Sequence, residues 1–199
     1  MSGLREHKRR KTVATIHHAG LRLFAERGYG AVTVADIADA ADVSRATVFS
    51  YFPAKEDIVL GDARAAIEGL RAVLAESDER VVPTVRSWLR TLVGWMEPDI
   101  VLMRRLGDEV PAVGAARSRV QRDLEGVIAE ALASEIGADD ALPARLVAGA
   151  LASAIGVVEA EAAARFANGG GPLEPADVDA LFDTAVAFVD AGLERVLRD

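Results

Sequence analysis

The sequence has no cysteine among its 199 residues. This absence excludes a disulfide scaffold, a zinc site with cysteine ligands and a thiol nucleophile. Long apolar runs are also missing, since the longest uncharged one, residues 146–158, is far shorter than the roughly 18 residues that a membrane span needs. The first residues are charged and lack the apolar centre of a signal peptide. We therefore expect a cytoplasmic protein with no membrane partner.

Apolar residues make up 51% of the chain, which is enough for a hydrophobic core and excludes a disordered protein. The net charge of −8 is uneven, because residues 1–60 carry a net +2 and the remainder −10. A basic cluster opens the chain: Arg5, Lys8, Arg9, Arg10 and Lys11. A basic start on an acidic body indicates that this end contacts a polyanion. On charge alone, a solvated helix start explains the same cluster.

Apolar residues recur at helical spacing along almost the whole chain, whereas strand patterns are nearly absent. We therefore predict an all-α fold of about nine helices. The predicted helices cover residues 5–27, 33–40, 45–51, 54–77, 82–96, 99–107, 112–136, 142–167 and 175–197.

Two short helices in the first quarter of the chain each have a clear start. Thr33 is followed by Asp36 at the spacing of a capping box, and Ser44 is a good N-cap for the second helix. Only residues 41–43 separate the two helices. Such a tight joint is typical of a helix-turn-helix unit.

The second short helix has two different faces. Val48 and Phe52 are four residues apart and should dock onto the first helix. The other face carries small side chains, hydroxyl groups and one arginine: Arg45, Ala46, Thr47, Ser50 and Tyr51. Such groups suit the major groove of DNA, since arginine binds guanine, methyl groups meet the thymine methyl and hydroxyls bind phosphate. Small helix pairs with polar faces also occur without DNA binding, and the basic first helix favours the DNA interpretation.

Residues 33–38 and 43–56 resemble the N-terminal domain of TetR-family transcriptional regulators. The preceding Ala19, Leu23, Phe24, Gly28 and Tyr29 also match that family's first helix. The resemblance covers about the first 60 residues. The remainder is similar only in length and helical content.

The resemblance implies a homodimer that binds a near-palindromic DNA operator, with the 45–51 helix of each subunit in a major groove. The implied base-facing residues are Arg45, Ala46 and Thr47, and the implied phosphate contacts are Thr33, Ser44, Tyr51 and Lys55. Phe49 departs from the family pattern, because many members have a tyrosine there whose hydroxyl binds phosphate. Phe49 therefore either only packs, or contacts a thymine methyl group or a sugar.

The resemblance also divides the chain into a DNA-binding domain, residues 1–53, and a ligand-sensing and dimerisation domain, residues 54–199. In the second domain, large and adaptable apolar side chains suit a ligand pocket: Trp88, Leu92, Trp95, Met96 and Met103. Candidate polar anchors are Arg104, Arg105 and Glu159. Alternatively, the apolar residues form ordinary core.

The helices over residues 142–167 and 175–197 are the predicted dimer surface. The first helix has only small residues along one side: Ala148, Gly149, Ala152, Ser153 and Gly156. The second carries a wide apolar stripe, formed by Leu181, Phe182, Val186, Phe188, Val189, Leu193 and Val196. A twofold dimer would match a palindromic operator. Alternatively, both faces pack only within one subunit.

Together these features predict a transcriptional repressor that a small-molecule effector releases from DNA. In this hypothesis the effector shifts the 54–77 helix, which connects rigidly to the DNA-reading helices. An activator or a global regulator without a ligand is the alternative. A helical enzyme or carrier is a remote alternative, because the sequence shows no nucleophile–base pair and no cofactor motif. No metal is expected either, since His17 and His18 point about 100° apart on a helix.

Overall fold

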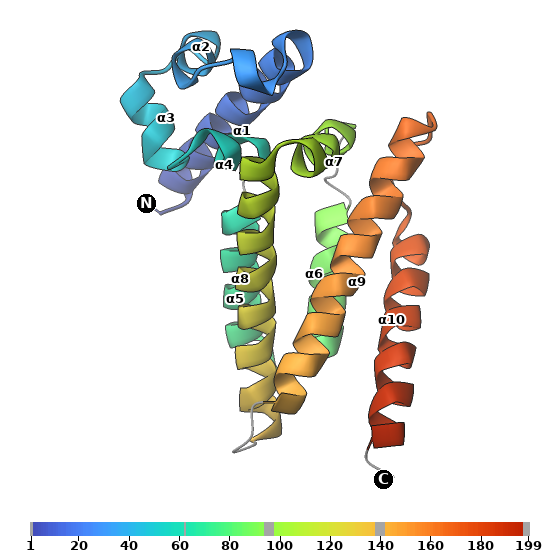
Figure 1. Ribbon diagram of the computed structural model, residues 1–199. Coiled ribbons are helices and arrows are strands. Elements are labelled where there is room, and N and C mark those ends of the chain that lie inside the picture. Colours follow the sequence, from blue (N-terminus) through green and yellow to red (C-terminus); the bar gives the residue numbers. More distant parts are fainter. Residues whose placement is uncertain (1, 62, 94–97, 138–141, 197–199) are drawn as a thin grey trace. The chain divides into compact units, whose positions relative to one another are not determined.

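The computed structural model describes residues 2–61, 63–93, 98–137 and 142–196, and the side chains of residues 7–187 within those ranges (Figure 1). These residues form ten α-helices and one 3-10 turn, and no strand occurs among them. The helices are α1 (Ser2–Arg27), α2 (Val34–Ala40), α3 (Arg45–Tyr51), α4 (Lys55–Val59), α5 (Ala63–Glu76), α6 (Val81–Val93), α7 (Ile100–Glu109), α8 (Pro111–Ile136), α9 (Leu142–Ala167) and α10 (Pro175–Val196), and the turn is η1 (Tyr29–Ala31). The predicted all-α fold is confirmed.

The single helix predicted over residues 54–77 is wrong, because the structure divides it into α4 and α5. Gly61 lies between them with a φ of 59°, in the left-handed region that favours glycine. The His17 ring of α1 packs against this turn, and a Cβ at Gly61 would lie 3.1 Å from it. The same ring donates through Nδ1 to the carbonyl oxygen of Ile58 at 2.7 Å. The predicted rigid connection of this segment to the first helices stays a prediction.

The chain forms two compact units, each with its own core. The first contains residues 1–63 and 102–119, and the second contains residues 64–101 and 120–199. Helix α8 therefore contributes its first residues to one unit and the rest to the other. The functional division predicted at residues 53 and 54 stays a prediction, since compactness does not test function.

The core of the first unit joins the helix-turn-helix to a later helical hairpin. Its buried side chains include Ile16, Phe24, Ile37, Val48, Phe52 and Ile58 from the N-terminal helices, and Leu106 and Val113 from α7 and α8. Helices α7 and α8 meet closely, because a Cβ at Gly114 would lie 2.8 Å from the carbonyl oxygen of Gly107. Helices α2 and α3 thus rest on a core that also contains residues from far along the chain.

The second unit packs α5, α6, α9, α10 and the later part of α8 around one core. Its most buried members are Leu70, Val85, Leu89, Ile128, Ala152, Val158, Val178 and Phe182. Helix α9 passes the length and hydropathy test for a membrane span, with 44% of its apolar window buried. A buried core helix passes the same test, so this feature alone is weak evidence for a membrane span.

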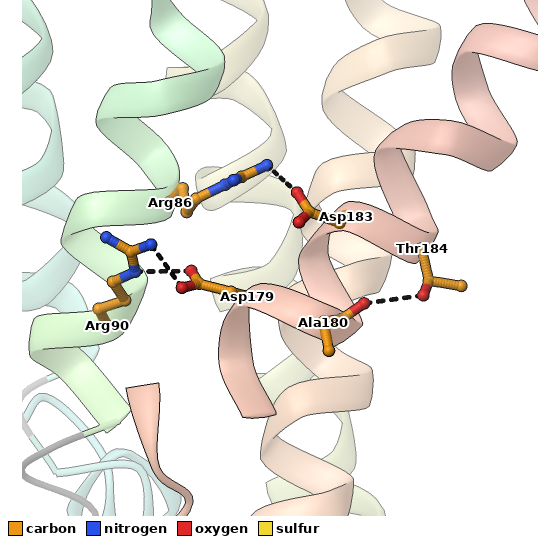
Figure 2. A network of polar contacts seen from close by, with 6 residues as sticks. All are labelled: Arg86, Arg90, Asp179, Ala180, Asp183 and Thr184. Carbon is orange, nitrogen blue, oxygen red and sulfur yellow. Dashed lines mark hydrogen bonds and ion pairs between the residues drawn. The ribbon is translucent and has the colours of Figure 1, made fainter. Parts of the chain in front are cut away.

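Two arginine–aspartate pairs join α6 to α10 (Figure 2). The Arg90 Nε donates to Asp179 Oδ1 at 2.6 Å, and Arg86 pairs with Asp183 one helical turn away. The Arg86 guanidinium also lies 5.2 Å from the centre of the Phe182 ring. The hydrogen bond from Arg90 lowers the pKa of Asp179 below its ordinary value. These pairs therefore form a ladder along the α6–α10 contact.

Candidate nucleic-acid interface

Helix α2 begins with the predicted capping box. The backbone N–H of Asp36 donates to the Thr33 hydroxyl at 3.2 Å, and the backbone N–H of Thr33 donates to Asp36 Oδ2 at 2.7 Å. The Thr33 hydroxyl also donates to the same carboxylate. These hydrogen bonds from Thr33 lower the pKa of Asp36. The capping box expected from the sequence is therefore confirmed, and it fixes the start of α2.

A tight turn carries the chain from α2 to α3. Asp42 has a φ of 53° and is the one non-glycine residue with a positive φ among those described. Aspartate tolerates this conformation better than most side chains. The backbone N–H of Val43 donates to the carbonyl oxygen of Ala38 at 3.0 Å and closes the turn. The predicted three-residue joint thus has a defined geometry.

Helix α3 has the two faces expected from its sequence. Val48 is fully buried and Phe52 is 3% exposed, so both belong to the core of the first unit. Arg45, Ala46, Phe49 and Ser50 are exposed, whereas Thr47 and Tyr51 are partly buried. Most of the residues predicted to read DNA therefore form one accessible surface on a capped helix, which we call the α3 face: Arg45, Ala46, Phe49 and Ser50.

The hydroxyl groups of α3 hydrogen-bond within the helix itself. The Ser44 hydroxyl caps the helix by accepting from the backbone N–H of Thr47 at 3.0 Å. It also lies 2.8 Å from the Thr47 hydroxyl. The Ser50 hydroxyl donates to the carbonyl oxygen of Thr47 at 2.7 Å. Among the four residues of the α3 face, Arg45 is the charged one.

Lys55 lies at the start of α4 and has a structural role that the sequence did not reveal. Its Nζ donates to the carbonyl oxygens of Tyr29 at 2.9 Å and Val32 at 3.0 Å. The same atom lies 4.0 Å from the centre of the Tyr29 ring. Burial, together with the charges of Glu56 and Asp57, raises the pKa of Tyr29 to about 12. Two of the three ammonium donors are therefore used, and one is left for the predicted phosphate contact.

The basic start of the chain lies on α1. Lys8, Arg9, Arg10 and Lys11 are all exposed there, and the Arg5 side chain falls outside the description. These residues place positive charge on the same unit as the α3 face. Such charge is the electrostatic feature expected of a DNA-binding domain.

The predicted ligand residues lie in both units. Trp88 and Leu92 are partly buried against the core of the second unit, whereas Met103 packs against the core of the first. Trp95 and Met96 lie outside the described residues. Arg104 has one guanidinium nitrogen, Nη1, that is buried without a hydrogen-bond partner. Arg105 is exposed and Glu159 is partly buried.

The predicted dimer helices each contribute to the core of their own unit. Ala148 and Ala152 of α9 are buried, and Phe182 of α10 is fully buried. The residues of the α10 stripe beyond Val186 lie outside the described side chains. Ser153 is exposed, and Gly149 and Gly156 are partly exposed. Helix α9 also has exposed apolar side chains that the sequence analysis missed: Leu142, Leu146 and Val157.

The structure describes no group of three or more His, Asp or Glu residues that could hold a metal ion. The His17 ring faces the backbone at Ile58, and its centre lies 5.4 Å from the centre of the His18 ring.

Three comparisons place the chain among known proteins. Residues 16–61 match the family model described as bacterial regulatory proteins of the tetR family. The HTH-type transcriptional regulator TcmR of Streptomyces glaucescens is 28% identical over 148 residues, which are 69% of this chain and 66% of TcmR. The HTH-type transcriptional regulator LuxR of Vibrio harveyi is 59% identical over 39 residues, which are 20% of this chain and 19% of LuxR. The matches thus span less than two thirds of these relatives, which are regulators and not enzymes.

A solved structure shares the fold over most of the chain. Thermus thermophilus FadR, a TetR-family transcriptional repressor in complex with lauroyl-CoA, matches with a TM-score of 0.54 and 24% sequence identity. The match covers 89% of this chain and 92% of FadR.

Proposed function

The chain belongs to the TetR family of transcriptional regulators, and from that premise we propose that it represses transcription from a palindromic operator. It would bind as a homodimer in the cytoplasm, and a small-molecule effector would release it. The proposal that the protein binds DNA rests on the α3 face. This face presents one arginine, one phenylalanine and two small side chains on a helix that is capped at its start and buried on its other side.

In the proposed complex α3 enters the major groove. Arg45 has the donors for a bidentate contact with guanine, and Ala46 and Thr47 stand beside it in the chain. Thr33, Ser44, Tyr51 and Lys55 are the proposed phosphate contacts.

The test is selection of bound fragments from random DNA at about 150 mM salt, because weak phosphate contacts fade at that concentration. We expect a palindrome with two half-sites. Arg45→Ala should then weaken binding to the selected site by about 1–3 kcal/mol and relax specificity at one base pair. The matched control is Arg122→Ala, which removes an exposed arginine from the second unit. Equal losses in both variants, or no enriched sequence, would contradict the proposal.

The exposed side of α9 supports the proposed dimer. Leu142, Leu146 and Val157 are 53%, 60% and 50% exposed, although they are large and apolar. Leu146, Ser153 and Val157 follow one another at spacings of seven and four, which places them on one side of the helix. A second copy of α9, together with α10, would cover this side.

Substitution of Leu146 tests the dimer directly. Leu146→Glu should give monomers in sedimentation velocity and weaken operator binding, because a charge would be buried in the interface. Ile136→Glu is the matched control, since Ile136 is 49% exposed on α8. A dimer that survives Leu146→Glu would contradict this surface.

The effector is proposed to contact Trp88 and Leu92, which pack against the core of the second unit. Contacts of the effector with Trp95, Met96, Met103, Arg104 and Glu159 stay predictions from the sequence. The lauroyl-CoA complex of FadR supports a small molecule as the kind of effector. Candidate metabolites should quench tryptophan fluorescence and release the selected DNA. A compound that does the first without the second binds but is not an inducer.

Repression itself is tested with a reporter gene placed behind the selected site. We expect the protein to lower transcription and the effector to restore it. Higher transcription with the protein present would identify an activator instead.

A further inference from the structure

Phe49 is an unusual residue for a protein surface. Its side chain is 46% exposed on α3, between the buried Val48 and the exposed Ser50. Among the described residues it is the one aromatic side chain in the group of exposed large hydrophobic residues. Phe49 follows Arg45 by four positions and Ala46 by three, so all three share one side of the helix. Packing within the chain therefore does not account for this residue.

The functional groups of Phe49 and of its neighbours on α3 limit which part of the DNA Phe49 can contact. Phenylalanine has no hydroxyl and donates no hydrogen bond to phosphate. The hydroxyls of Ser44, Thr47 and Ser50 already hydrogen-bond within the helix. Arg45 is the charged reader, and the apolar surface of the face comes from Ala46 and Phe49.

The major groove offers one apolar group on its base edges, the C5 methyl of thymine. We infer that Phe49 contacts this methyl group and makes thymine a requirement at one position of each half-site. The inference rests on the proposed sequence-specific binding by α3 and adds the chemistry of one base. Phe49 is thus a specificity-determining residue and not a phosphate contact.

The experiment compares thymine with uracil, which differ only in the methyl group. Each thymine of the selected site is replaced in turn by deoxyuridine, and dissociation constants are measured for the full-length protein and for Phe49→Ala. For the unsubstituted protein, we expect one position per half-site to weaken binding about fourfold, the factor for burial of one methyl group. In Phe49→Ala the same replacement should have no effect.

Two further variants sharpen the comparison. Ala46→Gly should leave the Phe49 position sensitive to uracil, since it removes a different methyl contact. Val73→Ala truncates a side chain that is also 46% exposed, on α5, and should leave the whole uracil profile unchanged. Melting temperatures of all variants confirm that they are folded.

Two results would overturn the inference while the proposed function stands. One is an enriched site at which uracil has no effect, which would indicate a sugar contact. The other is a Phe49→Ala variant in which every position that is sensitive to uracil in the unsubstituted protein keeps its full sensitivity. A pool that yields no enriched site would overturn the proposed function, and this inference with it.

Discussion

Replacement of Lys55 by methionine should loosen the connection between α1 and α2. The ammonium group makes two hydrogen bonds, to the carbonyl oxygens of Tyr29 (2.9 Å) and Val32 (3.0 Å), and lies 4.0 Å from the Tyr29 ring. Hydrogen bonds of charged groups contribute about 1.5–3 kcal/mol each, and an exposed cation–π contact about 0.5–1 kcal/mol. Lys55 is only partly buried, and water can reach the freed carbonyls. The lower ends of these ranges add to about 3.5 kcal/mol, and access of water to the freed carbonyls reduces the total loss that we expect to about 2 kcal/mol.

Amide hydrogen exchange is the suitable assay, because it reports local opening. Amides of residues 28–36 should exchange about thirtyfold faster in Lys55→Met, the factor that corresponds to about 2 kcal/mol. Lys55→Arg keeps the charge and should recover part of the protection. Lys8→Met is the control, since Lys8 is exposed on α1.

The same variant separates the structural role of Lys55 from its predicted phosphate contact. Loss of a phosphate contact lowers the slope of log affinity against log salt by about one. Unchanged amide exchange in Lys55→Met would refute the reasoning from the two hydrogen bonds. A reduced salt slope in that case would leave the phosphate contact as the role of Lys55.

Three further predictions concern stability. Asp42 has a φ of 53°, so Asp42→Gly should raise the melting temperature. Asp42→Ala should lower it, since an alanine in the left-handed region costs about 1 kcal/mol. Equal melting temperatures for the two variants would contradict backbone strain at this position. The pKa values of Asp36 and Glu135 are lowered by hydrogen bonds from Thr33 and from the Val81 N–H, respectively. The two carboxylates therefore stabilise the folded state above about pH 4, and this contribution is lost as the pH falls through their folded-state pKa values. In Asp36→Asn and Glu135→Gln, the urea concentration at the midpoint of unfolding should fall less steeply as the pH is lowered. The pKa of Tyr29 is raised to about 12, so its stabilisation is present below about pH 10 and is lost as the pH rises through 12. A tyrosinate absorbance step near pH 12 that is missing from Tyr29→Phe would verify this.

The helix-turn-helix could be predicted from the sequence because its signals are local. The cap residues Thr33 and Ser44 and the apolar pair Val48 and Phe52 lie within a few positions of the structure that they determine. The bounds of α3 and α9 were accordingly predicted to the residue.

The missed features depend on residues that are distant in sequence. Lys55 reaches carbonyl groups 23 and 26 positions away, and no local pattern indicates such a contact. The break at Gly61 was missed because the apolar spacing continues across it, while the packing that accompanies the break comes from His17 on another helix.

The ladder between α6 and α10 also determines the register of these two helices. Arg86 and Arg90 are one turn apart, as are Asp179 and Asp183, and the pairs run in opposite order along the two helices. If α10 slid along α6 by one turn, about 5.4 Å, one arginine would meet the other aspartate and one ion pair would replace two. A slide of half a turn would align neither pair. The ladder thus allows three discrete positions of α10, the observed one with two ion pairs and one on either side of it with a single pair, and it disfavours a gradual displacement.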